Sequence, residues 1–266
     1  MTRALSRRES RLKIQQAKAE LEKEGEEKAE QQRAEAEAKL AARQEKEEKT
    51  GKKQRGRRPR VPEPEQAEPE AKARRNFTDP ESRVVPDGAN KGSFLQGYNA
   101  QVAVDSTAQV IVAAEITQQA NDSRQLLPML EQVEVNMGRK PEAVSADAGC
   151  WSEANATDAS AAGIDLHIAT GRMKHDQTIA TVSGPPPDRA TPRQAMQHKL
   201  RTEDGHDLYK MRKAIVEPVF GQIKEQRGFR RFSMRGLNKV RAEWKLVCAT
   251  ANLLKLLRSG WAPQAA

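Results

Sequence analysis

The sequence contains few cysteines, few aromatic residues and no long apolar run. Of 266 residues, only Cys150 and Cys248 are cysteines, and 4% are aromatic. Two cysteines so far apart form no disulfide framework and match no zinc-site spacing, which favours a reducing cytoplasm. No stretch approaches the roughly 20 apolar residues that a membrane span requires, and no apolar segment follows the basic residues at the N-terminus. We therefore expect a protein that is neither secreted nor bound to a membrane.

Two common catalytic patterns are also missing. No pair among the four histidines has the helical spacing of a metal site, and no glycine-rich phosphate loop is present. These absences argue against a zinc hydrolase and against an ATP-driven enzyme.

Positive charge is plentiful, and it is unevenly distributed. The formal net charge is +9 and the sequence pI is near 9.6, which favours a polyanionic partner such as DNA, although many basic proteins are merely soluble. Residues 76–188 contain 7 Lys and Arg against 15 Asp and Glu, whereas residues 189–258 contain 17 against 6. This asymmetry suits a protein that holds metal with carboxylates and DNA with cations, or one whose basic helices dock onto an acidic half.

The first part of the chain is predicted to be a charged arm and a linker. Residues 1–49 are rich in Ala, Glu, Gln, Lys and Arg, which favour a solvated helix, and their sparse leucines make a coiled coil the weaker alternative. Residues 50–75 combine a basic cluster with a Pro- and Glu-rich stretch, which predicts an extended linker. The cluster fits either a solvated tail or a grip on DNA phosphates; it consists of Lys52, Lys53, Arg55, Arg57, Arg58 and Arg60.

Residues 76–258 have the pattern of an ordered α/β domain, followed by a tail over 259–266. Two β-branched runs, 94–105 and 109–117, flank a turn-like Ser-Thr pair and predict an antiparallel hairpin. The other expected elements are a weak strand over 77–85, a helix capped by Asn121 or Asp122 and stopped by Gly138, a strand over 142–147, a helix capped by Ser152 and a strand over 164–169. The resulting order, β-β-β-α-β-α-β, is that of an RNase-H-like mixed sheet flanked by helices.

The segment 178–197 and the C-terminal region complete this domain. The segment is rich in Pro, Thr and Ser, which predicts a mobile insertion. Apolar residues at helical spacing predict that a C-terminal helix packs on the sheet; they are Val240, Trp244, Val247, Ala251 and Leu254. Arg230 and Arg231 lie in an arginine-rich stretch that suits a DNA-backbone surface. Its Phe229 and Phe232 fit equally a core or stacking on bases.

Three carboxylates are candidates for a catalytic site. Asp147 ends an apolar strand and precedes Ala-Gly, which leaves room for a ligand, although a helix cap is the alternative. Glu217 shares a helical face with Lys213 and Lys224, a pattern that an ordinary ion-pair ladder also gives, and the proline after it predicts a kink or a first helical turn. Asp79 lies in an Asp-Pro turn pattern, and Asp105 is its rival because it ends a better strand.

Acids gathered in one place suit phosphodiester transfer. A nucleophilic water or 3′-hydroxyl must be activated and a leaving oxygen stabilised, and two divalent ions roughly 3.5–4 Å apart can do both. Magnesium prefers oxygen ligands, so carboxylates and a DNA phosphate complete its shell. The expected cofactor is therefore two Mg²⁺ ions, with Mn²⁺ as a substitute.

Several blocks, in order, resemble the DDE domain of bacterial insertion-sequence transposases. They are NFTDPESR, GYNAQVAVD, EITQQANDSRQLLPMLEQ, SADAGCWSEAN, IATGRMKH and the run from RKAIVEPVFGQIK to LLKLL, which together span nearly all of residues 76–258. The resemblance implies that Asp79, Asp147 and Glu217 are the metal-binding and catalytic acids. It also implies DNA contacts, and with the arginine-rich stretch these are Tyr209, Arg212, Lys213, Lys224, Arg230 and Arg231.

The activity implied by this resemblance is metal-dependent cleavage at insertion-sequence ends and joining to target double-stranded DNA. It further implies a homo-oligomer on DNA, acting in the cytoplasm at the nucleoid. The alternative is a catalytically silent, DNA-binding remnant.

The chain departs from the family pattern in three ways. The interval from Arg212 to Glu217 is one residue longer than usual, so that Lys213 occupies the usual position of the arginine. Cys150 replaces a tyrosine that usually follows the Asp-Ala-Gly block. Family members also commonly have a helical DNA-binding region before the charged arm, which predicts that this chain is truncated at its N-terminus.

Overall fold

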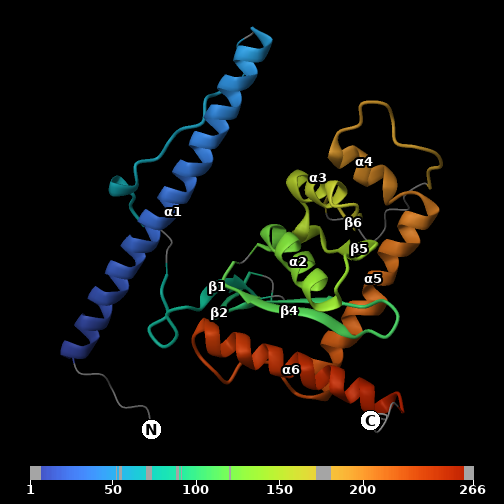
Figure 1. Ribbon diagram of the computed structural model, residues 1–266. Coiled ribbons are helices and arrows are strands. Elements are labelled where there is room, and N and C mark those ends of the chain that lie inside the picture. The colour runs from blue at the N-terminus through green and yellow to red at the C-terminus, as the bar shows by residue number, and fades with distance from the viewer. Residues whose placement is uncertain are drawn as a thin grey trace. The chain divides into compact units, whose positions relative to one another are not determined.

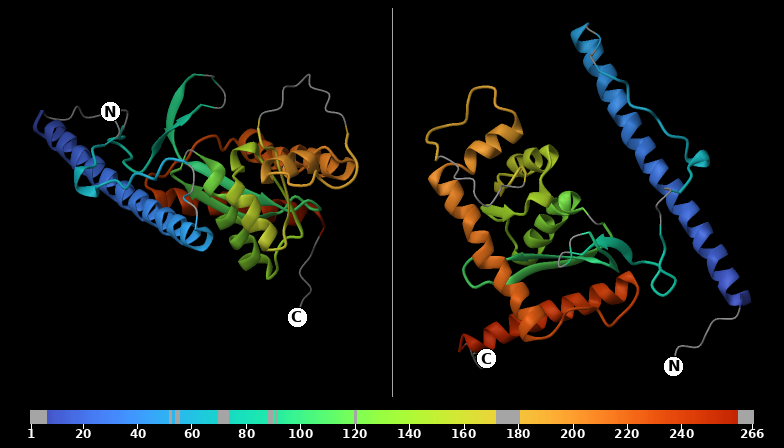
Figure 2. Two further views of the ribbon diagram at one scale, coloured as in Figure 1. Left: turned by 90° about the horizontal axis from the view of Figure 1, so that it is seen from above. Right: turned by 180° about the vertical axis from the view of Figure 1, so that it is seen from behind.

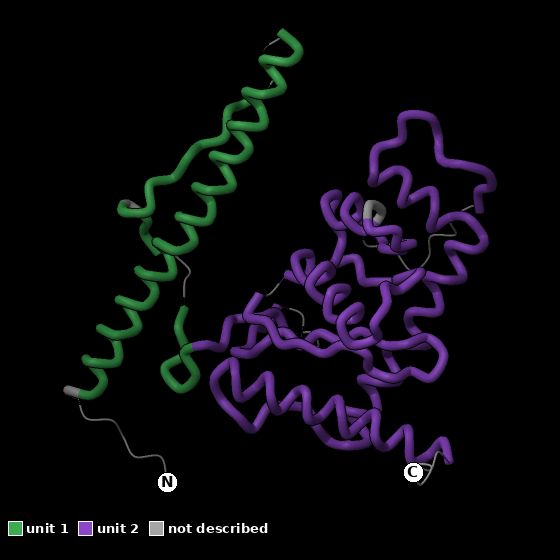
Figure 3. The backbone as a smooth tube through the Cα atoms, in the orientation of Figure 1, with its two compact units in different colours: residues 1–80 green, residues 81–266 purple. Residues whose placement is uncertain are grey.

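The computed structural model describes residues 7–51, 53, 56–69, 74–87, 90, 92–119, 121–171 and 181–260. The chain divides into two compact units, residues 1–80 and residues 81–266 (Figure 3). No helix within the described ranges is long and apolar enough to cross a membrane.

One long helix, α1, forms most of the first unit. It spans Arg7–Thr50 (Figure 1), and pairs of opposite charge four residues apart lie along it. Examples are Arg33 with Glu37 at 2.9 Å and Arg43 with Glu47 at 3.1 Å. The predicted charged helix is confirmed, because strong helix formers and these pairs support a helix without a core on every side.

The segment after α1 returns along the helix. The guanidinium of Arg43 donates to the carbonyl oxygen of Gly56 at 3.3 Å, and Arg75 pairs with Glu20 at 2.7 Å and with Glu24. This segment includes a short 3₁₀ turn, η1 (Pro64–Gln66). The described part of the predicted linker therefore packs on α1 instead of extending freely, because charges on the two segments complement each other. Lys52 and Arg55 of the basic cluster lie outside the described residues.

The second unit contains three pairs of strands. β1 (Arg83–Pro86) pairs with β2 (Phe94–Gly97), and β3 (Asn99–Val104) pairs with β4 (Ile111–Thr117), both antiparallel. β5 (Ala143–Ala146) and β6 (Asp165–Ile168) are parallel. Among the described residues these pairs form three separate two-stranded sheets, and not the continuous mixed sheet that the element order predicts.

The predicted hairpin is confirmed in β3 and β4, with three local differences. The run 94–105 forms two strands, β2 and β3, which are separated at Tyr98. Gln109 has a φ of 55° and belongs to the turn before β4, because the left-handed region cannot continue a strand. The ladder is also irregular between Ala103 and Val104, at the end where the turn closes.

Helices cover the two faces of the β3–β4 hairpin. α2 (Leu126–Met137) packs on one face and α6 (Leu237–Arg258) on the other (Figures 1 and 2). Ala113 contacts the α2 side through Met129 and Val133, whereas Ile116 belongs to the core on the α6 side. This division follows from the alternation of side chains along a strand.

An aromatic cluster fills the core on the α6 side. Trp244 is 3% exposed and stacks on Phe220 and Phe229, with ring centroids 6.3 and 6.5 Å apart. Phe232 meets Trp244 edge-on at 6.3 Å. The predicted packing of the C-terminal helix is confirmed, and both phenylalanines of the arginine-rich stretch belong to this core.

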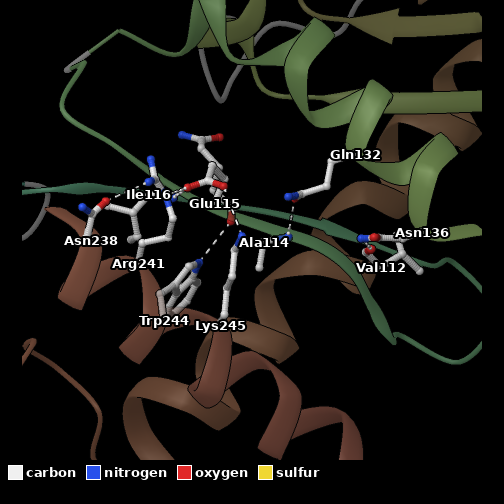
Figure 4. Close-up of polar contacts among 11 residues, drawn as sticks. Val112, Ala114, Glu115, Ile116, Gln132, Asn136, Asn238, Arg241, Trp244 and Lys245 are labelled. Carbon is white, nitrogen blue, oxygen red and sulfur yellow. Dashed lines mark hydrogen bonds and ion pairs between the residues drawn. The ribbon is translucent and has the colours of Figure 1, made fainter.

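The outer edge of β4 is bound by side chains and not by another strand (Figure 4). The backbone N–H of Ala114 donates to Gln132 of α2 at 3.0 Å, and Asn136 of α2 donates to the carbonyl oxygen of Val112 at 2.8 Å. From α6, Asn252 accepts from the N–H of Ile111 and donates to its carbonyl oxygen, both at 2.8 Å. These contacts satisfy backbone groups that would otherwise require a neighbouring strand, which explains why the hairpin ends at β4.

Replacing Asn252 with alanine is expected to destabilise the second unit by about 1–3 kcal/mol, because the buried Ile111 would lose partners for both backbone groups. Urea unfolding measures the change. Asn238→Ala is the control on the same helix, because Asn238 is exposed and makes one long contact with Arg241. Equal stability of the two variants would contradict the prediction.

A charged group lies beside this edge of the sheet. Glu115 of β4 pairs with Arg241 and Lys245 of α6 (Figure 4). Burial by itself raises the pKa of the Glu115 carboxyl. Hydrogen bonds from the backbone N–H of Ile116 and from the guanidinium of Arg241 lower it by more, so the pKa of Glu115 lies below its ordinary value. The pairing therefore attaches α6 to β4 as an ion pair, in addition to the apolar core.

β5 and β6 form the second layer of this unit. α3 (Glu153–Ala161) connects them, and one face of the pair packs Leu166 and Ile168 against Leu126 and Leu130 of α2. Gly138 ends α2 with a φ of 68°. The hydroxyl of Ser152 accepts from the N–H of Asn155 at 3.0 Å, as an N-terminal cap does. Both predicted helix signals are confirmed.

The segment 178–197 contains a helix, in contrast to the predicted mobile insertion. α4 spans Pro192–Lys199 and begins with a capping box between Thr191 and Gln194. Met196 is buried against the β5–β6 core. The Pro, Thr and Ser content that indicated a loop includes the Thr-Pro pair that starts this helix. Residues 178–180 lie outside the described ranges.

Candidate active site

Asp147 follows the C-terminal end of the parallel strand β5. It begins a short 3₁₀ turn, η3 (Ala148–Cys150), and its side chain is 67% exposed. Carboxyl ends of parallel strands are where α/β folds commonly present reactive groups. No side-chain cap is formed by Asp147, so the alternative of a helix cap is not supported.

Arg212 of α5 (Glu203–Gly221) binds this carboxylate. Its Nη1 donates to Asp147 Oδ1, and the guanidinium lies over the Tyr209 ring with its carbon 5.3 Å from the ring centroid. The Arg212 side chain is only 18% exposed. The structure therefore places Arg212 and Tyr209 beside the second predicted acid, with Arg212 acting as the cation that balances its charge.

Arg212 and two neighbouring polar side chains have buried polar atoms and are here called the polar layer: Ser145, His167 and Arg212. Ser145 and His167 are register partners in β5 and β6, and α5 contacts both strands. Three atoms of the polar layer are buried without a hydrogen-bond partner among the described residues: Ser145 Oγ, His167 Nδ1 and Arg212 Nε. The other ring nitrogen of His167 lies 3.0 Å from Asp165 Oδ2, and Asp165 in turn pairs with Lys199. This face of the β5–β6 pair is polar, whereas its opposite face packs in an apolar core.

Replacing Ser145 with alanine is expected to leave stability unchanged or raise it by up to about 1 kcal/mol, because a buried hydroxyl without a partner costs about 1–3 kcal/mol of desolvation. Ser152→Ala is the matched control, since the Ser152 hydroxyl caps α3 and its loss costs about 0.5–2 kcal/mol. Thermal unfolding of both variants tests this. A Ser145 variant as unstable as the Ser152 variant would show that the Ser145 hydroxyl has a partner.

Glu217 lies on α5 and is exposed. At about 100° per residue, Lys213 lies about 40° from Glu217 around the helix axis, while Arg212 lies about 140° away. The one-residue shift in spacing thus has a structural counterpart. Arg212 turns towards Asp147, and Lys213 shares the side of Glu217.

Pro218 lies inside α5 and not in its first turn. A proline cannot donate to the carbonyl oxygen four residues earlier. That oxygen, on Ala214, accepts from the side chain of Gln109 at 2.8 Å instead. A turn residue of the β3–β4 hairpin therefore supports the helix that carries Glu217. Of the two alternatives predicted for Pro218, a position in the first helical turn is wrong.

Of the other predicted DNA contacts, Lys213 lies within α5, whereas Lys224, Arg230 and Arg231 follow its end. A π-helical turn, η4 (Gln222–Gln226), carries Lys224, whose Nζ lies 5.1 Å from the centroid of the Phe220 ring. Lys213, Lys224 and Arg231 are exposed. Arg230 is also exposed but pairs with Glu225. These positive side chains are accessible to a polyanion.

The two candidates for the first acid differ in their surroundings. Asp105 Oδ2 accepts from the backbone N–H groups of Thr107 at 3.0 Å and Ala108 at 2.7 Å, so this carboxylate holds the β3–β4 turn. Asp79 is 9% exposed and belongs to the first unit. The structure gives Asp105 a local structural role, and Asp79 stays a prediction from the sequence.

The described residues include no group of three or more His, Cys, Asp and Glu side chains placed to hold a metal ion. The donor chemistry at Asp147 nevertheless suits a hard cation. Its oxygens are largely exposed and already face a positive group, the Arg212 guanidinium. A divalent ion at this position would replace that guanidinium as the counter-charge.

Cys150, which stands where the family usually has tyrosine, ends the η3 turn. Burial, followed by the charges of Asp122 and Asp147, raises the pKa of its thiol to about 11. The thiol is thus protonated at neutral pH and is a poor nucleophile. Its electrostatic surroundings also show that Asp122, which the sequence suggested only as a cap, lies near the Asp147 turn.

The pairing of Arg212 with Asp147 was not foreseen from the sequence. No local signal marks it, because the two residues are 65 positions apart and only the packing of α5 on β5 brings them together. The family motif indicated that both residues matter but assigned them separate roles.

Comparison with known families gives one result. A family model described as "Transposase DDE domain" matches residues 60–253. Searches of the curated proteins and of the solved structures gave no match. The matched range contains all three predicted acids and the predicted DNA contacts.

Proposed function

Because the chain belongs to the transposase DDE domain family, we propose that it cleaves DNA at insertion-sequence ends and joins the free 3′-hydroxyl to target DNA. The family is one of phosphoryl-transfer enzymes. The observation that carries the proposal within the structure is the position of Asp147, an accessible carboxylate at a parallel strand end, beside a cation from the helix that also bears Glu217. We also infer that the three strand pairs belong to an RNase-H-like arrangement, the fold that this family implies.

Asp147 and Glu217 would hold divalent ions, and Asp79 stays the predicted third acid. Bound Mg²⁺ or Mn²⁺ activates the attacking oxygen and stabilises the leaving oxygen. The chain's own contribution is to place hard oxygen ligands at the end of β5 and on α5. Until an ion binds, Arg212 balances the charge of the Asp147 carboxylate and orients it from a largely buried position.

The basic side chains on and after α5 would bind the DNA backbone. Lys213, Lys224 and Arg231 are exposed, so they can neutralise phosphates and release counterions. Arg230 must leave Glu225 to do the same. We propose that these residues position DNA along the side of α5 that Glu217 shares, with a second copy of the chain bound on the same DNA.

A second candidate is a catalytically silent DNA-binding protein. Two observations favour it: the described residues gather no three-acid cluster, and Arg212 is paired with the Asp147 carboxylate. Both candidates bind DNA in a salt-dependent way. They differ in whether DNA strands are broken.

The test is cleavage of supercoiled plasmid by the purified full-length chain. We expect nicked product with Mg²⁺ or Mn²⁺, none with EDTA, and binding that weakens as salt increases. Salt-sensitive binding without cleavage in either metal would support the silent candidate and reject the catalytic one. Absence of both activities would reject the two together.

A further inference from the structure

Asp122 lies beside the turn that carries Asp147, although the two residues are far apart in sequence. It begins η2 (Asp122–Arg124), the short 3₁₀ turn before α2. The cap of η2 is Asn121, whose side chain accepts from the N–H of Ser123 at 2.9 Å. The carboxylate of Asp122 therefore does not cap η2 and instead makes the contacts described next.

One oxygen of this carboxylate is fixed by strand β3. Oδ1 accepts from the side-chain amides of Asn99 at 2.6 Å and Gln101 at 2.8 Å. Gln101 also donates to Asn99 at 2.9 Å, which locks the two amides together. Hydrogen bonds to an ionised carboxylate are about twice as strong as neutral ones, so Asp122 is held in one orientation.

The other oxygen faces the backbone of Gly149 in η3. A β-carbon built on Gly149 would lie 3.1 Å from Asp122 Oδ2, a tight contact that the carboxylate relieves only by moving a few tenths of an ångström. Gly149 has no left-handed φ, so its backbone conformation does not require glycine. Glycine at this position therefore lets the Asp122 carboxylate lie close to the η3 backbone without displacement.

A buried amide joins the two turns from the side. Asn155 of α3 is 5% exposed and donates to the carbonyl oxygens of Ser123 at 2.6 Å and Cys150 at 2.8 Å. Both turns are thus tied to one side chain. Asp122 and Asn155 together fix η3 against η2, and Asp147 is the residue from which η3 starts.

From these contacts we propose that Asp122 is a positioning residue for Asp147. Its carboxylate, oriented by Asn99 and Gln101, supports the η3 turn through Gly149 and thereby sets the direction of the Asp147 side chain. This inference rests on the proposed function, because it concerns the acid on which that function depends. It adds a fourth carboxylate, which acts through another residue and does not itself touch substrate.

A double-mutant cycle on Asp122 and Gly149 tests the contact. Asp122→Ala is expected to lower the cleavage rate constant at saturating DNA by about 10- to 100-fold, the range typical of residues that orient a ligand. Gly149→Ala should lower it by about tenfold, because its methyl group displaces the carboxylate. Combining the two should be no worse than Asp122→Ala alone, since the methyl group then meets only the β-carbon of residue 122, at an ordinary contact distance of 3.6 Å.

Two matched controls separate this effect from general damage. Gly221→Ala adds a methyl group where no atom lies within 4 Å, and Asp158→Ala removes an exposed acid of α3. Both should cleave as the unchanged chain does. The KM for DNA should stay constant in every variant, because Asp122 is not proposed to bind DNA.

Binding of Mn²⁺ to the full-length chain, followed by electron paramagnetic resonance, gives a readout that does not need catalysis. We expect Asp147→Asn to abolish binding at this position and Asp122→Ala or Gly149→Ala to weaken it about tenfold at unchanged melting temperature. If Asp122→Ala does not fold, Gly149→Ala tests the same contact from the other side. Asp122→Asn keeps an acceptor for the two amides and the volume beside Gly149, so it should bind Mn²⁺ as the unchanged chain does.

The outcomes distinguish the two proposals. Loss of Mn²⁺ binding and cleavage in Asp147→Asn, with Asp122→Ala and Gly149→Ala unaffected, overturns the positioning role alone. Independent, multiplicative effects of the Asp122 and Gly149 changes overturn it as well. A wild-type chain that neither binds Mn²⁺ nor cleaves DNA overturns the proposed function and this inference together.

Discussion

Replacing Asp147 with asparagine is expected to lower DNA cleavage by on the order of a thousandfold. A metal ion that polarises a phosphoryl oxygen contributes several kcal/mol to transition-state stabilisation, and about 4 kcal/mol corresponds to a thousandfold in rate. Asparagine is nearly the same size but lacks the charge that binds the ion. Single-turnover cleavage of labelled DNA measures the effect without the contribution of product release.

The fold should survive this change. Asp147 is 67% exposed, and asparagine still offers an oxygen acceptor to Arg212. Melting temperature and DNA affinity should therefore match those of the unchanged chain. The control is Asp158→Asn, which removes the charge of an exposed acid on α3. Cleavage retained in Asp147→Asn would remove the basis for a catalytic role at this strand end.

The largest expected loss of stability comes from replacing Trp244 with alanine, about 3–5 kcal/mol. The side chain is 3% exposed and lies among Phe220, Phe229 and Phe232. Its Nε1 also donates to the carbonyl oxygen of Gln101 at 3.2 Å. The variant removes the centre of the core between the hairpin and α6 and leaves a cavity. Urea unfolding followed by circular dichroism measures the loss.

Leu246→Ala is the matched control for this prediction. Leu246 lies two residues later on the same helix and is 65% exposed, so its loss should change stability by less than about 0.5 kcal/mol. The ratio of the two effects distinguishes core packing from helix propensity, because both substitutions place alanine in α6. A Trp244 variant as stable as the Leu246 variant would mean that the aromatic cluster is not a core.

Elements with local signals were predicted well. The charged composition of α1, the stop at Gly138 and the cap at Ser152 each act within about one helical turn, so the sequence contains their cause. The β3–β4 hairpin is similar, because both strands and their turn are adjacent in the chain. The first residue of β4 was predicted wrongly, because Gln109 adopts a left-handed conformation that is uncommon for glutamine.

Other elements depend on partners that are distant in the sequence. Thr191 and Pro192 start a helix inside a segment whose composition indicated a loop, and Met196 anchors that helix in the core. Pro218 is tolerated inside α5 because Gln109 binds the carbonyl oxygen that the proline leaves without a donor. Composition and spacing alone do not reveal such partners.

The candidate site shows the same division between local and distant causes. Asp147 stood out because a short apolar strand ends at a carboxylate followed by two small residues, and the family match covers it. Asp122 did not stand out, because its partners Asn99 and Gly149 are 23 and 27 positions away. Its role becomes visible only when β3, η2 and η3 are seen together.

By itself, the sequence determined the charged arm, the Gly138 stop, the Ser152 cap, the hairpin and the family, because each depends on neighbouring residues or on the order of motifs. The expected cap of α2 by Asn121 or Asp122 is wrong, because Asn121 caps the η2 turn and α2 begins at Leu126 without a side-chain cap. Tertiary structure alone decided that Arg212 faces Asp147, that side chains of α2 and α6 close the edge of β4, and that Asp122 supports the η3 turn. The reason is physical: hydrogen bonds and ion pairs act over a few ångströms, and only the packing of distant segments brings these groups within that range.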